Sequence, residues 1–165
     1  CVIGGICLVG VLPALLLPAI ARAIRNAKAT RCANNLAMLY KMQHNYAAQY
    51  GGPDHLMPTQ IGGQFWLHLN TMTPPMIDNT MASGSTNIYE CPMEGSPNAP
   101  GTTDYRGPAM NINSHSVLEG DPIGADKIGN HGSGEGGNVI RKSGDVLTVG
   151  AHDPVWTAAS SKTSP

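Results

Sequence analysis

The pattern of hydrophobic and polar positions divides the chain into an apolar beginning, an amphipathic continuation and a polar, interrupted remainder. Residues 1–21 contain no charged side chain. A helix of this length, at about 1.5 Å per residue, just spans a hydrocarbon core of about 30 Å. The run therefore predicts a membrane-spanning helix. A secretory signal peptide is the competing interpretation because an Ala-x-Ala sequence ends at Ala23, but the run has no basic region in front of it.

Helix-weakening residues interrupt this apolar run. Pro13 and Pro18 each remove a backbone donor, and Gly4, Gly5 and Gly10 lower the helix propensity further. A permanent lipid anchor gains nothing from these defects. A helix that leaves lipid and repacks in a bundle of protein helices can use the flexibility.

Residues 22–52 continue the helix with an amphipathic pattern. The apolar positions that fall near one face are Cys32, Leu36, Leu39, Tyr46 and Tyr50, with Asn35 and Gln43 as polar interruptions. The sequence Gly51-Gly52-Pro53 is a strong stop signal. One helix over residues 1–50 is predicted, about 75 Å long if it is unbroken.

Residues 53–165 predict a loop-rich β head, because turn signals such as GGPD, TPPM, SPNAPG and GEGG recur. The strand candidates are Phe65–Leu69, Asn87–Cys91, Asn138–Arg141 and Val146–Val149. The last two flank residues 142–144 and predict a hairpin. The expected fold class is α+β, with the long helix packed against a small antiparallel head. The tail, residues 157–165, is polar and is expected at the surface, where Thr157, Ser160, Ser161, Thr163 and Ser164 are candidate acceptors of O-linked glycans.

Charge is unevenly distributed along the chain. The first 50 residues carry five basic residues and no acid, whereas residues 51–165 carry five basic and eleven acidic ones. Arg22, Arg25, Lys28 and Arg31 recur every third residue as a basic stripe. Such asymmetry usually indicates a nucleic acid or membrane partner. Here the acidic head of another copy is a third candidate, and we expect the stripe to meet it.

The four cysteines are Cys1, Cys7, Cys32 and Cys91, and no C-x-x-C occurs. Cys32 and Cys91 lie in polar surroundings and are candidates for a disulfide, which would stabilise the chain by about 4 kcal/mol and indicate an oxidising compartment. Two unrelated thiols are the alternative. Because the sequence begins with Cys, we expect a processed or incomplete chain.

Candidate catalytic and metal-binding motifs are sparse. Residues 132–137 match G-x-G-x-x-G but lack the strand before and the helix after that a dinucleotide site requires. The six histidines form no close pair, and each is expected to be a surface or loop residue. Glu119 and Asp121 offer oxygen ligands for calcium, but their spacing fits no EF-hand. We expect no enzyme activity, no cofactor and no metal centre.

The first 50 residues resemble the N-terminal helix of type IV pilins and type II secretion pseudopilins. The similarity is greatest to the prepilin-like branch that ends in an H-x9-D-G motif. It is carried by the run Leu15–Ala19, by Cys32 with Asn34-Asn35-Leu36, and by Tyr46 and Tyr50. Later counterparts are Tyr89–Pro92, then Tyr105 with Met110-Asn111, and the closing segment His131–Val146.

Three departures from this family pattern stand out. The glutamate that the family has in its apolar run aligns with Cys1, which would place the family's methylated N-terminal residue four positions earlier. Pro13 is an additional proline. In the closing motif, eleven residues separate His131 from Ser143-Gly144, and serine replaces the aspartate.

The resemblance implies a pilin-like structural subunit of an extracellular or cell-surface filament. Its precursor would sit in the inner membrane with the head outside the cytoplasm, and an assembly platform with a motor ATPase would build a helical homopolymer. The expected filament-core residues are Ile6, Leu8, Gly10, Leu12, Pro13, Leu15, Leu16, Leu17, Pro18 and Ile20. A pseudopilin of a secretion machine and a membrane-tethered binding module that never polymerises are the alternatives. Adhesion, motility, DNA uptake and secretion are not distinguished.

Overall fold

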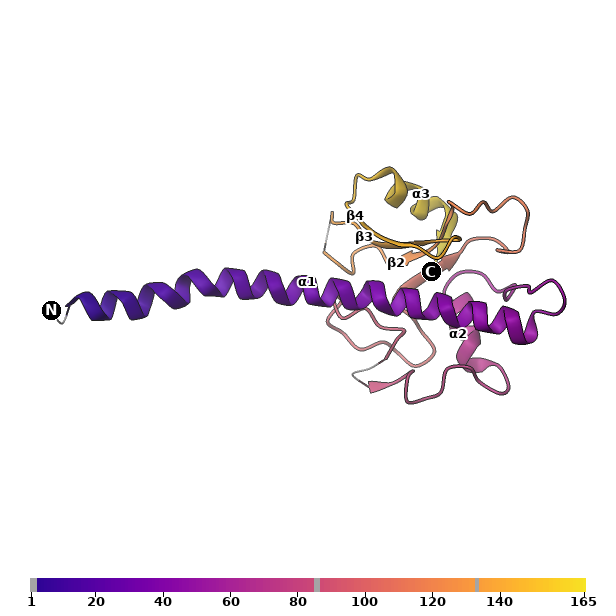
Figure 1. Cartoon of the computed structure of the whole chain (residues 1–165), viewed down its shortest axis with the longest axis horizontal. Helices are drawn as coiled ribbons and strands as arrows, with labels where there is room; N and C mark the ends of the chain where they lie inside the picture. Colours follow the sequence, from indigo (N-terminus) through magenta and orange to yellow (C-terminus); the bar gives the residue numbers. More distant parts are fainter. Residues whose placement is uncertain (1–2, 85–86, 133) are drawn as a thin grey trace.

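One long helix extends from a small head that the rest of the chain forms (Figure 1). A computed structural model describes residues 3–84, 87–132 and 134–165, and within these ranges it describes side chains from Leu16 onward. Helix α1 spans Ile3–Tyr50 and passes through both prolines, which confirms the predicted long helix over this range. The predicted stop is also confirmed, since Gly52 adopts a φ of 71° directly after the helix.

The head contains a five-stranded antiparallel sheet in the order β4-β3-β2-β1-β5. The strands are β1 (Tyr105–Pro108), β2 (Pro122–Asp126), β3 (Gly137–Arg141), β4 (Val146–Val149) and β5 (Thr163–Ser164). The expected α+β class with an antiparallel head is therefore confirmed. The predicted hairpin is confirmed as β3 and β4, which pair from Gly137 opposite Val149 to Ile140 opposite Val146.

Helices cover both faces of the sheet. Neighbouring residues of a strand point to opposite faces. Val139 belongs to the hydrophobic cluster that includes Trp156 of helix α3 (Pro154–Lys162), whereas Ile140 belongs to the cluster that includes Leu36 of α1. Figure 1 shows α3 and α1 on opposite sides of the sheet. Strand β2 is buried along its whole length as a result.

The second half of α1 supplies one wall of the core. We call residues 32–47 the docked segment, in which Cys32, Leu36 and Leu39 are fully buried. Both predicted polar interruptions have partners in the head: Gln43 donates to the Phe65 carbonyl and Asn35 donates to the Glu90 carbonyl at 3.0 Å. The side-chain nitrogens of both amides are thus hydrogen-bonded, whereas the buried Gln43 Oε1 has no hydrogen-bond partner among the described residues.

Three local predictions were wrong. Residues 65–69 belong to helix α2 (Gln64–Thr71) rather than to a strand, because an apolar run this short fits either element. Residues 87–91 form a turn in which the Asn87 side chain accepts from the Tyr89 amide at 3.0 Å. The C-terminal tail, residues 157–165, is only partly a surface segment: it forms most of α3 and all of β5, and Ala159 and Thr163 are buried.

The β3–β4 turn is held against α1. The Tyr40 hydroxyl donates to the Lys142 carbonyl, and Gly144 adopts a φ of 90° beside the same ring. A Cβ at Gly144 would lie 2.7 Å from Tyr40 Cε1, so only glycine fits both the turn and the contact. Tyr50, which the pattern placed on the buried face, is 44% exposed because α1 ends beyond the head's core there.

Candidate functional site

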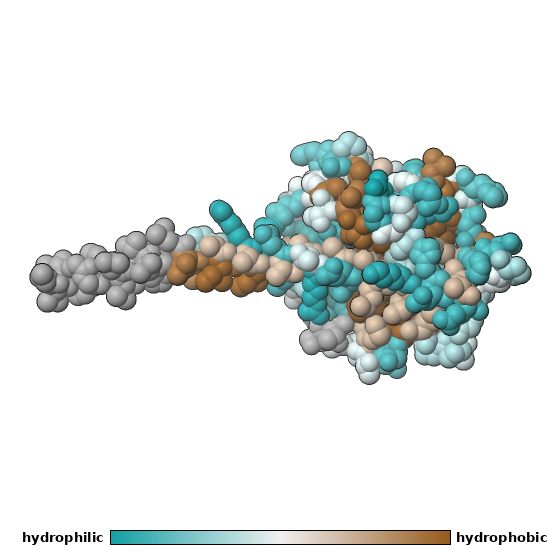
Figure 2. Space-filling view, viewed as in Figure 1, coloured by the Kyte–Doolittle hydropathy of each residue, from teal (hydrophilic) through white to brown (hydrophobic). Residues whose placement is uncertain are grey.

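An apolar stripe runs along the part of α1 that projects from the head. We call residues 16–28 the stem. Its large apolar residues Leu16, Leu17, Ile20 and Ile24 are 55%, 66%, 52% and 55% exposed. Figure 2 shows hydrophobic colour along the described part of this projecting helix. Four neighbouring apolar side chains without a cover are unusual for an isolated soluble helix.

This stripe lies on the part of α1 that projects beyond the head, to one side of the face that docks on the head. At 100° per residue, Leu17, Ile24, Ile20 and Leu16 lie about 60°, 80°, 120° and 160° around the helix axis from Cys32, the first residue of the docked segment. Arg25 lies on the same side as Cys32 and reaches the head. The head leaves all four apolar side chains exposed, so they are free to contact a second molecule or a lipid phase.

The predicted filament-core residues fall partly outside the described side chains. Leu16, Leu17, Pro18 and Ile20 are described and exposed. The other six (Ile6, Leu8, Gly10, Leu12, Pro13 and Leu15) and Cys1 lie outside the side chains that the structure describes. Among the residues that the structure describes, no helix has a stretch long and apolar enough to cross a membrane.

The four residues of the basic stripe differ in whether they contact the chain's own head. Arg25 forms an ion pair with Glu135 and donates to the His131 carbonyl at 2.9 Å, both in its own head. Arg31 also makes an interaction within the chain. Arg22 and Lys28 are exposed, and neither forms an ion pair among the residues from Leu16 onward that the structure describes. These two are the cations that remain available to another molecule.

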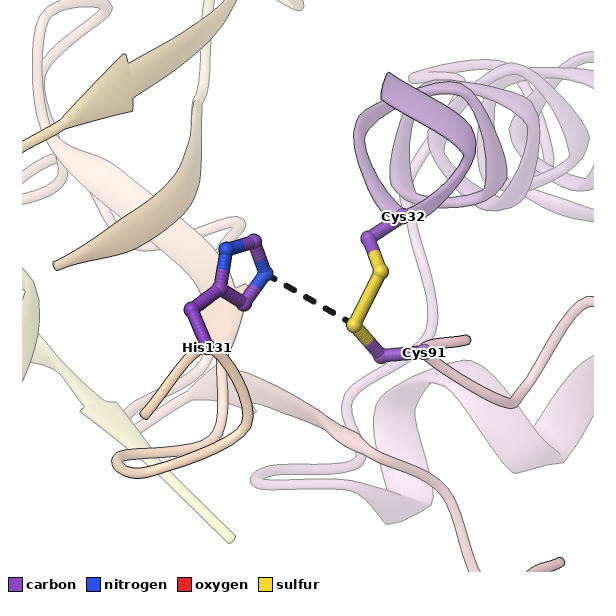
Figure 3. A group of neighbouring side chains, drawn as sticks. All are labelled: Cys32, Cys91 and His131. Carbon is purple, nitrogen blue, oxygen red and sulfur yellow. Dashed lines mark hydrogen bonds between the residues drawn. A yellow bond between two sulfur atoms is a disulfide. The ribbon is translucent and has the colours of Figure 1, made fainter. Parts of the chain in front are cut away.

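The predicted disulfide between Cys32 and Cys91 is confirmed. It joins α1 to the loop that precedes β1, with Cα atoms 4.9 Å apart, and both residues are almost fully buried. Figure 3 shows His131 turned toward the two sulfurs, with Nε2 at 3.6 Å from Cys91 Sγ. The disulfide therefore fixes the start of the docked segment against the head.

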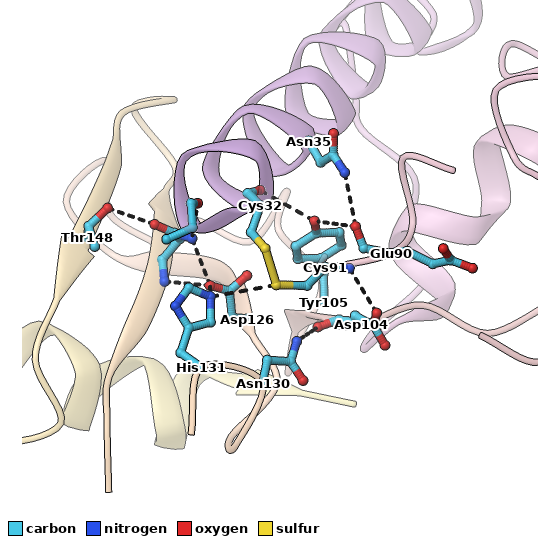
Figure 4. Close-up of a disulfide and its surroundings, with 12 residues drawn as sticks. Cys32, Asn35, Glu90, Cys91, Asp104, Tyr105, Asp126, Asn130, His131 and Thr148 are labelled. Carbon is cyan, nitrogen blue, oxygen red and sulfur yellow. Dashed lines mark hydrogen bonds and ion pairs between the residues drawn. A yellow bond between two sulfur atoms is a disulfide. The ribbon is translucent and has the colours of Figure 1, made fainter. Parts of the chain in front are cut away.

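Hydrogen bonds surround this disulfide on the Cys91 side (Figure 4). The Cys91 amide donates to Asp104 Oδ2 at 2.8 Å, and the Tyr105 hydroxyl donates to the Glu90 carbonyl at 3.1 Å. Burial, and next the neighbouring Glu94, raises the pKa of Asp104 to about 6. Burial also raises the pKa of Tyr105. The disulfide thus lies in a dry, polar part of the core.

A buried carboxylate and histidine complete the group that we call the disulfide centre (Cys32, Cys91, Asp126, His131 and Asn138). Asp126 Oδ2 lies 2.7 Å from His131 Nε2, and it accepts from the backbone and side-chain nitrogens of Asn138 at 2.7 and 2.8 Å. Asp126 and Asn138 are fully buried, and His131 is 8% exposed. These contacts connect β2, β3 and the loop between them.

His131 lies in a loop, as expected, but it is buried, which the sequence pattern did not predict. The available signal was the resemblance of its segment to a closing family motif that begins with histidine. The same ring nitrogen, Nε2, contacts both Cys91 and Asp126. A catalytic relay instead needs one nitrogen for the nucleophile and the other for the acid. Both sulfurs are also bonded to each other, so this arrangement provides no thiol nucleophile.

Arg106 places a buried positive charge beside the disulfide centre. Its Nε donates to the Asp126 carbonyl at 3.1 Å, and its guanidinium lies 5.1 Å from the centre of the Trp156 ring. Burial lowers the pKa of this guanidinium, and Asp126 partly offsets that effect. A buried cation beside a buried carboxylate reduces the desolvation penalty of both.

The remaining sequence candidates do not form a site. Asp121 Oδ1 is paired with Lys162 Nζ at 2.5 Å, and its other oxygen accepts from the Leu118 amide. The glycine-rich residues 132–137 lead into β3, not into a helix, as expected. Among the glycan candidates, Thr163 is buried and its hydroxyl donates to the Ala159 carbonyl, whereas Thr157, Ser160 and Ser161 are exposed.

No family model, curated protein or solved structure matches this chain.

Proposed function

We propose that this protein is the structural subunit of a type IV pilus-like filament that polymerises through its N-terminal helix. The observation that carries the proposal is the apolar stripe of the stem, which is exposed on the part of the helix that projects beyond the chain's own head. Fully burying one leucine or isoleucine side chain stabilises an assembly by about 1.5–3 kcal/mol. A homopolymer in which stems pack together would bury this stripe on every subunit.

Charge supports contact between copies. Arg22 and Lys28 of the stem are exposed, and the residues after position 50 carry a net charge of −6. A neighbouring head can therefore attract the stem of the next subunit. Exposed pairs of this kind are screened by salt, so they direct the packing of subunits more than they stabilise it.

Before assembly the stem and the apolar run in front of it would be held in the inner membrane, with the head outside the cytoplasm. Lipid already covers apolar side chains, so moving the helix from lipid to filament changes little hydrophobic free energy. Extraction therefore calls for an external motor, an assembly ATPase with its platform. Exposed O-linked glycans on Thr157, Ser160 and Ser161 are compatible with this arrangement.

A matched pair of substitutions tests the role of the stripe. Leu17 and Leu118 are both 66% exposed, one on the stem and the other on the head. Leu17→Asp is expected to abolish filaments in sheared, detergent-free cell-surface material viewed by electron microscopy. Leu118→Asp is the control and should leave fibres that contain this chain, as mass spectrometry identifies it.

Each outcome of the microscopy has a distinct meaning. Long fibres in the wild type and none with Leu17→Asp would support the filament subunit. Short fibres that appear only when the protein is overproduced would instead favour a pseudopilin of a secretion machine. A chain that stays monomeric in the membrane fraction, with no fibres, would overturn polymerisation and leave the membrane-tethered binding module.

A second pair of substitutions tests the charges. Arg22→Glu together with Lys28→Glu places two acids opposite an acidic head, and fibre yield should fall most at low salt. Lys41→Glu, on the exposed side of the docked segment, is the control. Equal fibre yields for the two variants would contradict the contact between stem and head.

A further inference from the structure

We propose that the dithiol form of the head binds one Zn²⁺ ion through Cys32, Cys91 and His131. The two sulfurs and a ring nitrogen of His131 all lie within 4.8 Å of one another and are buried (Figure 3). In the disulfide form the sulfurs are bonded to each other and hold no metal. The proposed metal would replace the disulfide as the link between α1 and the sheet.

The distances suit a tetrahedral zinc site. Zinc lies about 2.3 Å from thiolate sulfur and about 2.0–2.1 Å from imidazole nitrogen, so ligand atoms around it are separated by about 3.5–3.8 Å. Cys91 Sγ and His131 Nε2 are already 3.6 Å apart. Once the disulfide is reduced, Cys32 Sγ has only to move away from Cys91 Sγ by a side-chain rotation.

Asp126 lies beside this ligand set and holds its histidine in place. Its Oδ2 lies 2.7 Å from His131 Nε2, the same nitrogen that faces Cys91. Its Oδ1 is buried and has no hydrogen-bond partner among the described residues. Two thiolates neutralise the charge of Zn²⁺, and Arg106 nearby offsets the charge of the Asp126 carboxylate beside the site.

The chemistry balances with an external reductant. A dithiol or phosphine reductant donates two electrons to the disulfide, which gives two thiols, and zinc binding then releases one proton from each thiol. Every chain also begins in this form, because cysteine enters proteins as the thiol. The zinc and disulfide forms are therefore alternatives for one pair of sulfurs. The proposal does not depend on the filament function.

The experiment uses the full chain in mild detergent, with Cys1→Ser and Cys7→Ser so that only Cys32 and Cys91 bind as thiols. After anaerobic reduction and removal of the reductant, Zn²⁺ is titrated against a chromophoric chelator. Co²⁺ is used in parallel as a spectroscopic probe. We expect one Zn²⁺ per reduced chain, none per oxidised chain, and thiolate charge-transfer and tetrahedral d–d bands with Co²⁺. A reduced chain that binds zinc no better than the oxidised chain would overturn the proposal.

Substitutions of His131 identify the ligand. Loss of a residue that hydrogen-bonds to a metal ligand weakens metal binding by roughly 10–100-fold. His131→Ala removes a ligand itself and should weaken zinc binding by more than this. His115→Ala, at an exposed histidine, is the matched control and should bind like the parent. Equal affinity of His131→Ala and His115→Ala would also overturn the proposal.

A conservative variant separates ligation from folding. His131→Cys supplies a third thiolate and should keep zinc binding while the Co²⁺ charge-transfer band grows. Near-ultraviolet circular dichroism of each oxidised variant reports whether the head is folded. If His131→Ala is unfolded even when oxidised, its zinc affinity cannot be interpreted, and the test rests on His131→Cys. Zinc binding retained by His131→Cys supports the site, and zinc binding lost by it overturns the proposal.

Discussion

The stem and the docked segment are parts of one helix in opposite environments. In the docked segment Leu36 and Leu39 are fully buried, whereas Leu17 of the stem is 66% exposed. The helical backbone is continuous between them, so helix propensity does not explain the contrast. The difference arises because the head covers only one end of the helix. The docked segment has already buried its apolar face against the head. The stem can gain the free energy of burying its apolar side chains only from another molecule.

The largest expected effect comes from removing the disulfide at the start of the docked segment. Replacing Cys32 and Cys91 together with Ser should lower the free energy of unfolding of the head by about 4 kcal/mol, because the bond closes a long loop in the unfolded chain. Denaturation in urea followed by tryptophan fluorescence measures this loss. Cys7→Ser, which keeps the pair intact, is the control. A loss below about 1 kcal/mol would mean that the helix docks without its disulfide.

A leucine exchanged at each end of the helix tests the contrast directly. Leu36→Ala should destabilise the head by about 2–5 kcal/mol, because it leaves a cavity in the core. Leu17→Ala should change the stability of the monomer by less than about 0.5 kcal/mol, since its side chain is exposed. Thermal unfolding of both variants in detergent gives the comparison. Equal losses would show that the stem packs on the head in solution.

The two regions should also differ in their response to pH. No acidic or histidine residue occurs before His44, so the stem carries no group that titrates between pH 3 and 7. In the head, burial and then Glu94 raise the pKa of Asp104 from 3.8 to about 6. The folded state prefers the protonated carboxyl. The contribution of Asp104 to the free energy of unfolding is therefore complete below about pH 3.8 and is lost as the pH rises through about 6.

Asp104→Asn is the variant that isolates this titration, because it keeps an oxygen acceptor for the Cys91 amide. Its free energy of unfolding should depend less on pH over this range than that of the wild type. Asp78→Asn changes an exposed carboxyl whose pKa is lowered, mainly by the hydrogen bond from Thr80, so the decline with rising pH should persist. Identical pH profiles for wild type and Asp104→Asn would remove Asp104 as the cause.

The smallest effect is expected at the boundary between stem and docked segment. Arg25 and Glu135 are both about half exposed, so Glu135→Gln should lower the free energy of unfolding by no more than about 1 kcal/mol, and less at high salt. Glu119→Gln is the control, since Glu119 is more exposed and lies 3.7 Å from Lys142. A loss of several kcal/mol for Glu135→Gln would show that the docked segment extends past Arg25.

Long elements, and elements bounded by strong turn signals, were predictable from the sequence. The helix, its stop at Gly51-Gly52 and the β3–β4 hairpin follow from periodicity and turn residues that act over a few positions. Strands β1 and β2 were missed because burial on both faces removes the alternation that marks a half-buried strand. The apolar run at residues 65–69 is strand-like by itself, and only its packing against α1 and β1 makes it helical.

The stem and the disulfide centre also differ in how far the sequence predicted them. The stem residues were predictable because exposure and charge follow from their place on one helix. The disulfide centre was only half predictable: two cysteines suggested a pair, but nothing local places His131 and Asp126 beside it. Their approach depends on the pairing of β2 with β3, which is a long-range contact.

The position of β5 has a consequence for how the chain acquires its structure on the ribosome. Strand β1 pairs with β2 on one side and with Thr163 and Ser164 on the other. During synthesis the outer edge of β1 must wait until all residues up to 164 have emerged. Meanwhile it presents unpaired backbone groups to other nascent chains. A chain truncated before Thr163 would have a head that is open along one strand, prone to edge-to-edge association and a natural client for chaperones.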